Sequence, residues 1–319
     1  MSEPFMHDTY LPFTKEDLLE HFATVAGKPQ KGRHLRYFTD SLKQHADYLE
    51  AYEERKPTPS DIRIGRQLEK DERFWVVSAL MSLYHQPDGD VARAQAFADL
   101  LHRADLRPPD GFTNWVSALA GGLKLYFEVN LPSPIRYRKW LEEHLDERVL
   151  IPYVREAASR AAAKGARLEG TTKADAMLLA PSTGVAVIFE AKVLSDVSTH
   201  ITFDVARNQL ARNIDVMLEP GSGKSPLNQR QPKLTSLVLI TPDLFRRRAA
   251  GLRSSRLYGW LMDAYTEPGN GLLAEHLGCR EPEELVDVAS RLGWASWEDV
   301  NVVMPGACSW LTADNKDTL

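Results

Sequence analysis

Hydrophobic residues recur every three to four positions through most of the first 130 residues, as they do in amphipathic helices. Thr14 is followed by Asp17 three positions later, a capping box that predicts a helix starting after Thr14. Helical spacing continues in 34–55, 71–85, 90–106 and 112–129. Gly121 and Gly122 weaken the last of these helices. The pattern predicts an all-helical N-terminal domain over residues 1–133.

The pattern changes twice in the middle of the chain. One long helix or two abutting helices are expected over 135–165, and residues 167–193 then alternate and are rich in strand-favouring side chains. Helical spacing returns at 202–220, and 234–245 is a short apolar run typical of a buried strand. This order predicts an α/β core over residues 134–256. Short helical patterns predict a helical C-terminal extension over residues 257–319.

Composition is that of an ordinary globular protein, with 319 residues, 43% hydrophobic and 26% charged. The net charge of -5 excludes a uniformly basic coat but leaves room for a local basic groove. Two cysteines without a CxxC pair exclude a disulfide framework and a typical structural zinc site. We find no signal-peptide pattern and no apolar run near the roughly 20 residues that span a bilayer. A soluble, cytoplasmic protein without membrane contact is expected.

The candidate chemistry lies in the strand-rich segment. Pro181, Ser182 and Gly184 are turn residues, so 173–193 is a candidate antiparallel hairpin. If residues 181–184 form its loop, Asp175 stands opposite Glu190, and Lys192 shares the face of Glu190 because side chains alternate. The three side chains are therefore expected to converge.

Two carboxylates placed opposite each other destabilise a sheet unless a cation neutralises them. Mg²⁺ prefers carboxylate oxygens and keeps several waters for chemistry, and a nearby lysine ammonium can hold a phosphate oxygen or an activated water. These parts suit phosphodiester hydrolysis. The alternative is that Glu190 and Lys192 merely end a strand in solvent, which their apolar flanks argue against.

Asp175, fourteen intervening residues and Glu190-Ala191-Lys192 resemble the motif of the PD-(D/E)xK, or restriction-endonuclease-like, nuclease superfamily. The resemblance covers roughly residues 140–245, and Ala174 replaces the proline of the motif name. It implies a mixed-sheet core with the order helix, three strands, helix, strand. It also implies Mg²⁺, or Mn²⁺ in its place, bound by Asp175, Glu190 and the Ala191 carbonyl, with Lys192 assisting the attacking water.

Further site residues follow from the same resemblance. Many members place a glutamate on the first core helix, for which Glu156 is the candidate and Glu147 the alternative. Gln209 matches the glutamine that RecB-like relatives use on the helix after the motif, although Asn213 stands where that pattern has tyrosine. Arg212 and Asn213 share the face of Gln209 and could hold a phosphate, or simply form a polar face.

Arginines cluster just after the last core strand, in 244–256. Phosphate contacts by such residues raise affinity without reading sequence, although a charge run is often only a solvated surface. The candidates for nucleic-acid binding there are Arg246, Arg247, Arg248 and Arg253.

The sequence thus predicts a Mg²⁺-dependent endonuclease that hydrolyses DNA, ahead of RNA, by metal-activated water. Two alternatives stay open: an RNase, and a catalytically silent subunit that binds nucleic acid or a partner protein on the same fold. Candidate partners besides nucleic acid are a second copy of the chain and an activator bound at the N-terminal helical domain.

Overall fold

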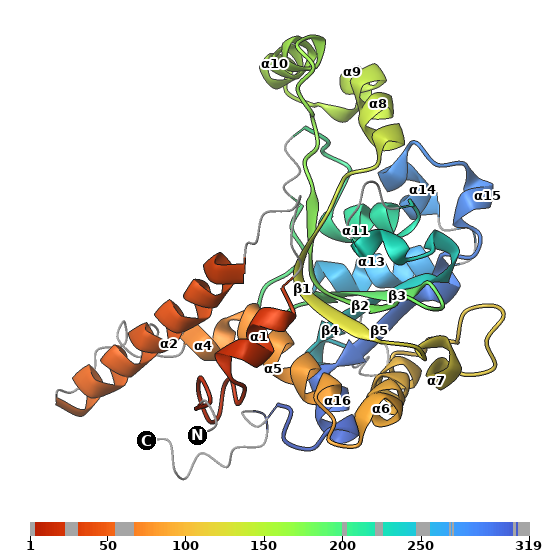
Figure 1. Ribbon diagram of the computed structural model, residues 1–319. Coiled ribbons are helices and arrows are strands. Elements are labelled where there is room, and N and C mark those ends of the chain that lie inside the picture. Colours follow the sequence, from red (N-terminus) through yellow and green to blue (C-terminus); the bar gives the residue numbers. More distant parts are fainter. Residues whose placement is uncertain are drawn as a thin grey trace.

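The computed structural model describes residues 4–22, 31–54, 67–199, 203–220, 226–246, 256–267, 269, 271–308 and 311. Within them, five strands form one mixed sheet in the order β1-β2-β3-β4-β5 (Figure 1). The strands are β1 (Lys124–Leu131), β2 (Thr172–Ala180), β3 (Val185–Ala191), β4 (Thr235–Thr241) and β5 (Leu292–Ser296). β1 to β3 are antiparallel neighbours, and β3 to β5 run parallel. The α/β prediction is confirmed at this level.

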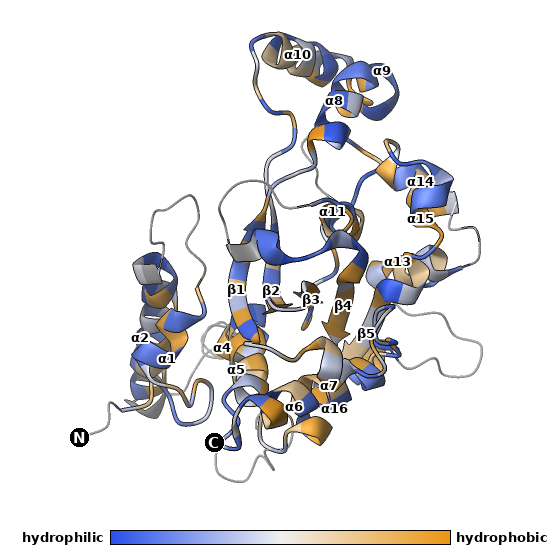
Figure 2. Ribbon diagram, turned by 45° about the vertical axis from the view of Figure 1, so that its right-hand side comes forward, coloured by the Kyte–Doolittle hydropathy of each residue, from blue (hydrophilic) through white to orange (hydrophobic). Residues whose placement is uncertain are grey.

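Helices cover both faces of the sheet. One face packs against α5 (Glu72–Tyr84), α6 (Gly89–Arg103) and α16 (Trp297–Val303). The other packs against α11 (Gln209–Met217), α13 (Leu257–Thr266) and α14 (Gly271–Leu277). β3 and β4 are buried along their whole length and are mostly apolar, and Figure 2 shows them as the hydrophobic centre.

Two helical groups project from this body. The first consists of α1 (Lys15–Glu20), α2 (Lys31–Glu54) and α4 (Gln67–Lys70). The second, here called the arm, is inserted between β1 and β2 and consists of α8 (Ile135–Glu143), α9 (Leu145–Arg148) and α10 (Pro152–Ala163) (Figure 1). The arm has its own small core, which includes Tyr137, Leu141 and Ala158. The expected one or two helices over 135–165 are therefore three.

Short elements complete the described chain. They are the helices α7 (Trp115–Ala118), α12 (Asp243–Arg246) and α15 (Pro282–Leu285), and the 3-10 turns Pro226–Gln229, Pro232–Leu234 and Ala289–Arg291. No helix among the described residues combines the length and the apolar character that crossing a membrane requires.

The prediction of an all-helical N-terminal domain is wrong for β1. Gly121 and Gly122 have φ values of 90° and 82°, in the left-handed region, so they turn the chain between α7 and β1. A Cβ atom on Gly121 would lie 2.7 Å from Ser182, so this turn also needs glycine for close approach to the β2–β3 loop. The glycines end the helix rather than weaken it.

The prediction of a purely helical C-terminal extension is also wrong. β5 pairs in parallel with β4 from Leu237↔Leu292 to Thr241↔Ser296. β1 lies in the predicted N-terminal domain, β2 to β4 lie in the predicted core, and β5 lies in the predicted C-terminal extension. All three predicted segments therefore contribute strands to one sheet.

The predicted hairpin register is confirmed. Ala180 pairs with Val185 and Ala176 pairs with Phe189, with Gly184 in the turn at a φ of 77°. This register places Asp175 and Glu190 at the next position along the two strands.

The regular alternation of β1 and β2 breaks at one level of the sheet. Phe127 packs in the core on the α5 face, whereas Val129 packs on the α11 face, although residues two apart normally share a face. Glu128 between them has a φ of 54°, which is rare for a residue with a side chain. On β2, Ala176, which pairs with Phe127, packs on the α5 face, and Ala174, which pairs with Val129, packs on the α11 face. The break therefore lies at Glu128 and its neighbour Asp175.

Candidate active site

Asp175, Glu190 and Lys192 meet at the ends of β2 and β3. The Lys192 ammonium donates to Glu190 Oε1 at 2.6 Å, and the backbone N–H of Ala191 donates to Asp175 Oδ2 at 2.8 Å. Glu190 is 0% exposed and Lys192 is 5% exposed, so neither ends a strand in solvent. The convergence predicted from the sequence is present, and the simple solvent-exposed alternative is wrong.

Helix α11 supplies two more donors to Glu190. Asn208 caps the helix by accepting from the Ala211 N–H, which orients the first turn toward β3. Gln209 then donates to Glu190 Oε1 at 2.6 Å, and Asn213, one turn on, donates to Oε2 at 2.8 Å. Gln209 thus lies in direct contact with Glu190.

A third acid, not predicted from the sequence, comes from α5. Glu72, in the first turn of that helix, lies 3.7 Å from the Lys192 ammonium through Oε2. Its Oε1 accepts from the Val193 N–H at 3.2 Å and from the Ser195 hydroxyl. Glu72 therefore ties the segment after β3 to α5.

Acids outnumber cations in this site, and its titration reflects that. Burial and the neighbouring Glu190 raise the pKa of Asp175 to about 8. Burial also raises the pKa of Glu190, against the opposing effect of Lys192. For Lys192, burial lowers the pKa, but the charges of Glu190, Asp175 and Glu72 outweigh it and the pKa is raised. Lys192 is therefore a permanent cation at neutral pH.

The donor set fits a hard divalent cation. A carboxylate has about four lone-pair positions; three of those on Glu190 and one on Asp175 accept the hydrogen bonds described above, so both retain capacity. Within the described residues, no three Asp, Glu, His or Cys side chains group tightly enough to hold a metal alone. The expected ligand set, two carboxylates and the Ala191 carbonyl, would thus rely on water, which Mg²⁺ retains readily.

Glu156, the predicted metal ligand on the first core helix, is a wrong prediction. It lies on α10 in the arm, exposed, and forms an ion pair with Arg160 one turn away. Glu147, the alternative, is exposed on α9. The error follows from the missed β1. Because β1 is the first strand of the sheet, the helix that precedes the sheet is not α10 but one of the earlier helices, and α5 is the one that brings a glutamate to Lys192.

The predicted phosphate-binding residues are largely engaged elsewhere. Arg212 binds the backbone carbonyls of Gly170 and Thr171 and pairs with Glu169. Asn213 is fully buried, so it positions Glu190 and does not face a phosphate. Arg246 pairs with Asp299 and Asp105. Arg247, Arg248 and Arg253 lie outside the described residues.

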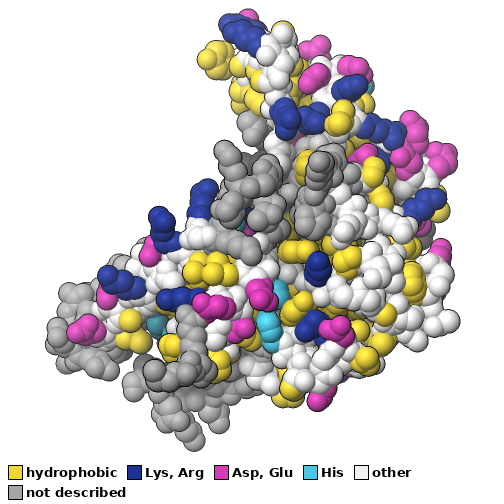
Figure 3. Space-filling model, viewed as in Figure 1, with side chains coloured by type: hydrophobic (Ala, Val, Ile, Leu, Met, Phe, Trp, Pro, Cys, Tyr) yellow, Lys and Arg dark blue, Asp and Glu magenta, His cyan; other side chains and the backbone are white. Residues whose placement is uncertain are grey.

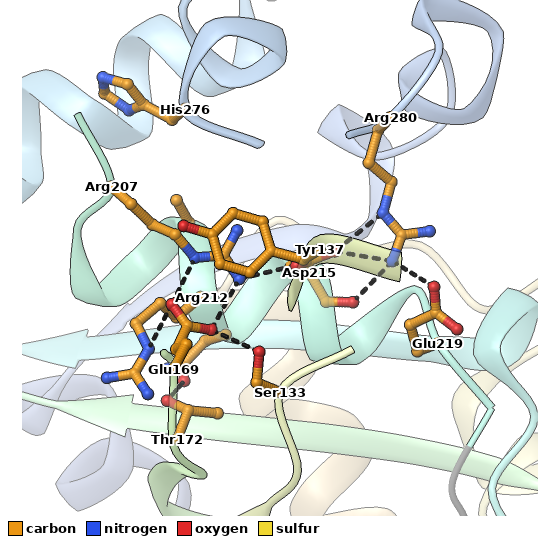
Figure 4. Close-up of polar contacts among 12 residues, drawn as sticks. Ser133, Tyr137, Glu169, Thr172, Arg207, Arg212, Asp215, Glu219, His276 and Arg280 are labelled. Atoms are coloured by element: carbon orange, nitrogen blue, oxygen red, sulfur yellow. Dashed lines mark hydrogen bonds and ion pairs between the residues drawn. The ribbon is translucent and has the colours of Figure 1, made fainter. Parts of the chain in front are cut away.

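Behind α11 lies a second, larger set of buried charges, here called the arginine network (Figure 4). Arg207 is 1% exposed, stacks on the Tyr137 ring at 3.5 Å and pairs with Asp215 and Glu169. Arg280 pairs with the same Asp215 at 2.7 Å. The network joins the arm, α11 and the segment after α14, and so fixes the helix that carries Gln209.

Comparison with protein-family models, curated proteins and solved structures finds no match for this chain.

Proposed function

We propose that this chain is a metal-dependent nuclease of the PD-(D/E)xK type that hydrolyses phosphodiesters, with DNA as the preferred substrate class. The observation that carries the proposal is the convergence of Asp175, Glu190 and Lys192 on two hairpin strands, with Gln209 on Glu190 from the following helix. The proposal is therefore supported by contacts in space as well as by the spacing of the residues in the sequence.

The order of elements supports the same proposal. Apart from α6 and α7, which lie between α5 and β1, and the arm, which lies between β1 and β2, the order is helix α5, strands β1, β2 and β3, helix α11 and strand β4, that is, helix, three strands, helix, strand. The arm is then an insertion between the first two core strands, and Glu72 on α5 takes the role that the resemblance assigns to a glutamate on the first core helix.

Each residue has a distinct part in the proposed reaction. Asp175, Glu190 and the Ala191 carbonyl would hold Mg²⁺, which when bound lowers the pKa of water and offsets phosphate charge. Lys192, as a permanent cation, donates a hydrogen bond to the attacking water or a phosphate oxygen; it does not accept the proton. A water oxygen bonds to phosphorus, the bond to the 3′ oxygen breaks, and one proton of that water is transferred through solvent to the 3′ oxygen, so that a 5′-phosphate and a 3′-hydroxyl result.

Cleavage assays on the purified full chain test the proposal. Supercoiled plasmid, linear duplex, single-stranded DNA and RNA are incubated with Mg²⁺, Mn²⁺ or EDTA, beside Asp175→Ala and Lys192→Ala. We expect metal-dependent cutting that both variants lose. Cutting retained by both variants would place the activity at another site.

A silent binding subunit is the second candidate, and one observation favours it. Glu190 and Lys192 are nearly inaccessible, at 0% and 5%, so the side chains that would bind the metal and the water are largely closed to solvent. A protein of this kind would bind nucleic acid equally well with Mg²⁺ and with EDTA and would cut none of the four substrates.

A further inference from the structure

Two cations share one buried acid beside the candidate active site. Arg73 Nε lies 3.4 Å from Glu128 Oε1, and the Lys173 ammonium contacts Glu128 Oε2. The Glu128 side chain is only 6% exposed, whereas those of Arg73 and Lys173 are 39% and 41% exposed. A negative charge below two half-exposed positive charges leaves an excess of positive charge at the surface.

This group adjoins the acids of the site. Glu128 lies between Phe127, which pairs with Ala176, and Val129, which pairs with Ala174, and so neighbours Asp175 across the sheet. The break in strand alternation falls at the same level. Although the hairpin register sets Lys173 opposite Lys192, Lys173 contacts Glu128 on the other side. Strained backbone next to a candidate site is commonly retained because it aims side chains.

The first described turns of α2 extend the positive surface. Arg33 is exposed there, and His34 stacks on Phe22 at 4.7 Å. Burial lowers the pKa of His34, and the charges of Lys173, Arg73 and Arg33 lower it further, as expected for cations gathered around one ring. Figure 3 shows Lys and Arg side chains along α2, on the side toward the arm.

Arg73 is also held in place from its own helix. Its backbone N–H donates to the Asp71 cap of α5, and its guanidinium lies 4.2 Å from the centre of the Tyr37 ring. Glu72, the preceding residue, approaches Lys192. Helix α5 thus offers an acid to the candidate active site and a cation to the surface beside it in consecutive positions.

We propose that Arg73 and Lys173, aligned by Glu128 and supplemented by Arg33, form a phosphate-binding site that holds the nucleic-acid backbone next to the phosphodiester at Asp175 and Glu190. This site rests on the proposed function. It replaces Arg212 and Arg246 as the phosphate contacts, because the side chains of those two are only 20% and 24% exposed, whereas Arg73 and Lys173 share one acid and are 39% and 41% exposed. It makes the N-terminal helices part of the substrate surface.

Binding in EDTA tests this site without turnover. The anisotropy of a fluorescein-labelled single-stranded DNA oligonucleotide is titrated with wild type, Arg73→Gln, Lys173→Gln and Arg33→Gln over a salt series. A lost charge-assisted phosphate contact weakens binding about tenfold. It also reduces the slope of log affinity against log salt by about 0.7. Arg107→Gln is the matched control, because Arg107 is exposed after α6 and belongs to neither site.

A change of opposite sign separates binding from folding. Glu128→Gln keeps shape but removes the negative charge, so it should tighten binding of the same oligonucleotide several-fold while the Arg73 variant weakens it. If breaking the ion pairs of Glu128 instead unfolded the protein, both Glu128→Gln and Arg73→Gln would bind the oligonucleotide more weakly, and both would have a lower Tm. Arg73→Lys should restore part of the affinity.

The outcomes are distinct for the two proposals. Wild-type cleavage together with unchanged affinity in the Arg73 and Lys173 variants would overturn the phosphate site and leave the nuclease proposal standing. Absence of both binding and cleavage in the wild type would overturn both. Weakening in the two variants, tightening in Glu128→Gln and no change in Arg107→Gln support the site.

Discussion

The protein contains two clusters of buried charge on either side of α11, and they differ in balance. In the arginine network, Arg207 and Arg280 meet Asp215 and Glu169, and the pKa of Arg207 is raised: burial opposes the charge, but its acidic neighbours outweigh burial. In the candidate active site, Asp175, Glu190 and Glu72 surround a single Lys192.

This difference in charge balance indicates that the arginine network stabilises the fold, whereas the candidate active site has the composition of a binding site. A buried ion pair that is fully compensated holds elements together, and removing one partner leaves an unpaired charge in the interior. A buried surplus of acid instead costs stability, and it persists where a cation or a substrate completes the set. The comparison yields four predictions, given from the largest expected effect to the smallest.

Asp175→Asn should abolish cleavage while leaving the fold intact. Removing one of two carboxylates from the ligand set should lower the cleavage rate roughly a thousandfold, measured on the best substrate with saturating Mg²⁺. The metal-free variant should unfold at the same or a higher temperature than wild type at pH 8, because it has lost a repelling charge. A lower Tm would mean that Asp175 is part of the scaffold.

Arg207→Met should mainly lower the stability of the fold. The methionine fills much of the same space, but Asp215 and Glu169 lose a buried partner, which costs about 3–5 kcal/mol of unfolding free energy. Urea unfolding followed by circular dichroism measures the loss, with Arg160→Met on the exposed face of the arm as control. An unchanged midpoint would show that the network is not what holds α11 to the arm.

The stability of the metal-free protein should fall as pH rises from about 4 to about 8. Folding raises the pKa of Asp175 from 3.8 to about 8, so the folded state binds more protons than the unfolded state in this window. Urea midpoints in EDTA across the window measure the slope, which Asp175→Asn should flatten. Mg²⁺ should raise Tm more at the alkaline end, because binding must displace the proton. A slope unaffected by Asp175→Asn would assign it to other groups.

Glu72→Gln should reduce cleavage about tenfold, the usual range for a residue that orients a ligand set from outside. Glu156→Gln should leave the rate unchanged, since Glu156 is exposed in the arm and pairs with Arg160 there. Parallel rate measurements on the two variants decide which helix serves the site. Equal losses in both would contradict the assignment to α5.

The sequence predicts the hairpin and the side chains that meet on it because both are local. The turn residues fix the register, the register brings Asp175 to Glu190, and Gln209 follows within one helix. It does not predict Glu72, which reaches Lys192 only through the packing of α5 on the sheet. It misses β1 and β5 because an apolar segment fits a buried helix or a buried strand equally well.

The same limit explains the arginine predictions. A run of arginines looks like a phosphate surface until its acidic partners arrive from distant segments, as Asp299 and Asp105 do for Arg246. Arg73 and Lys173 do not belong to a run of basic residues in the sequence. They come together at Glu128 only through the packing of α5, β1 and β2.

The buried indole of Trp297, which follows β5, donates its N–H to the carbonyl oxygen of Lys192 at 3.1 Å. Because synthesis proceeds from the N-terminus, Trp297 is added to the chain 105 residues after its hydrogen-bond partner Lys192. The pairing of β4 with β5 and the hydrogen bond from Trp297 can form only after residues 292–297 have been synthesised. A nascent chain that already carries the acids and the lysine therefore still has an unfinished site, and a truncated product ending before β5 would lack it permanently.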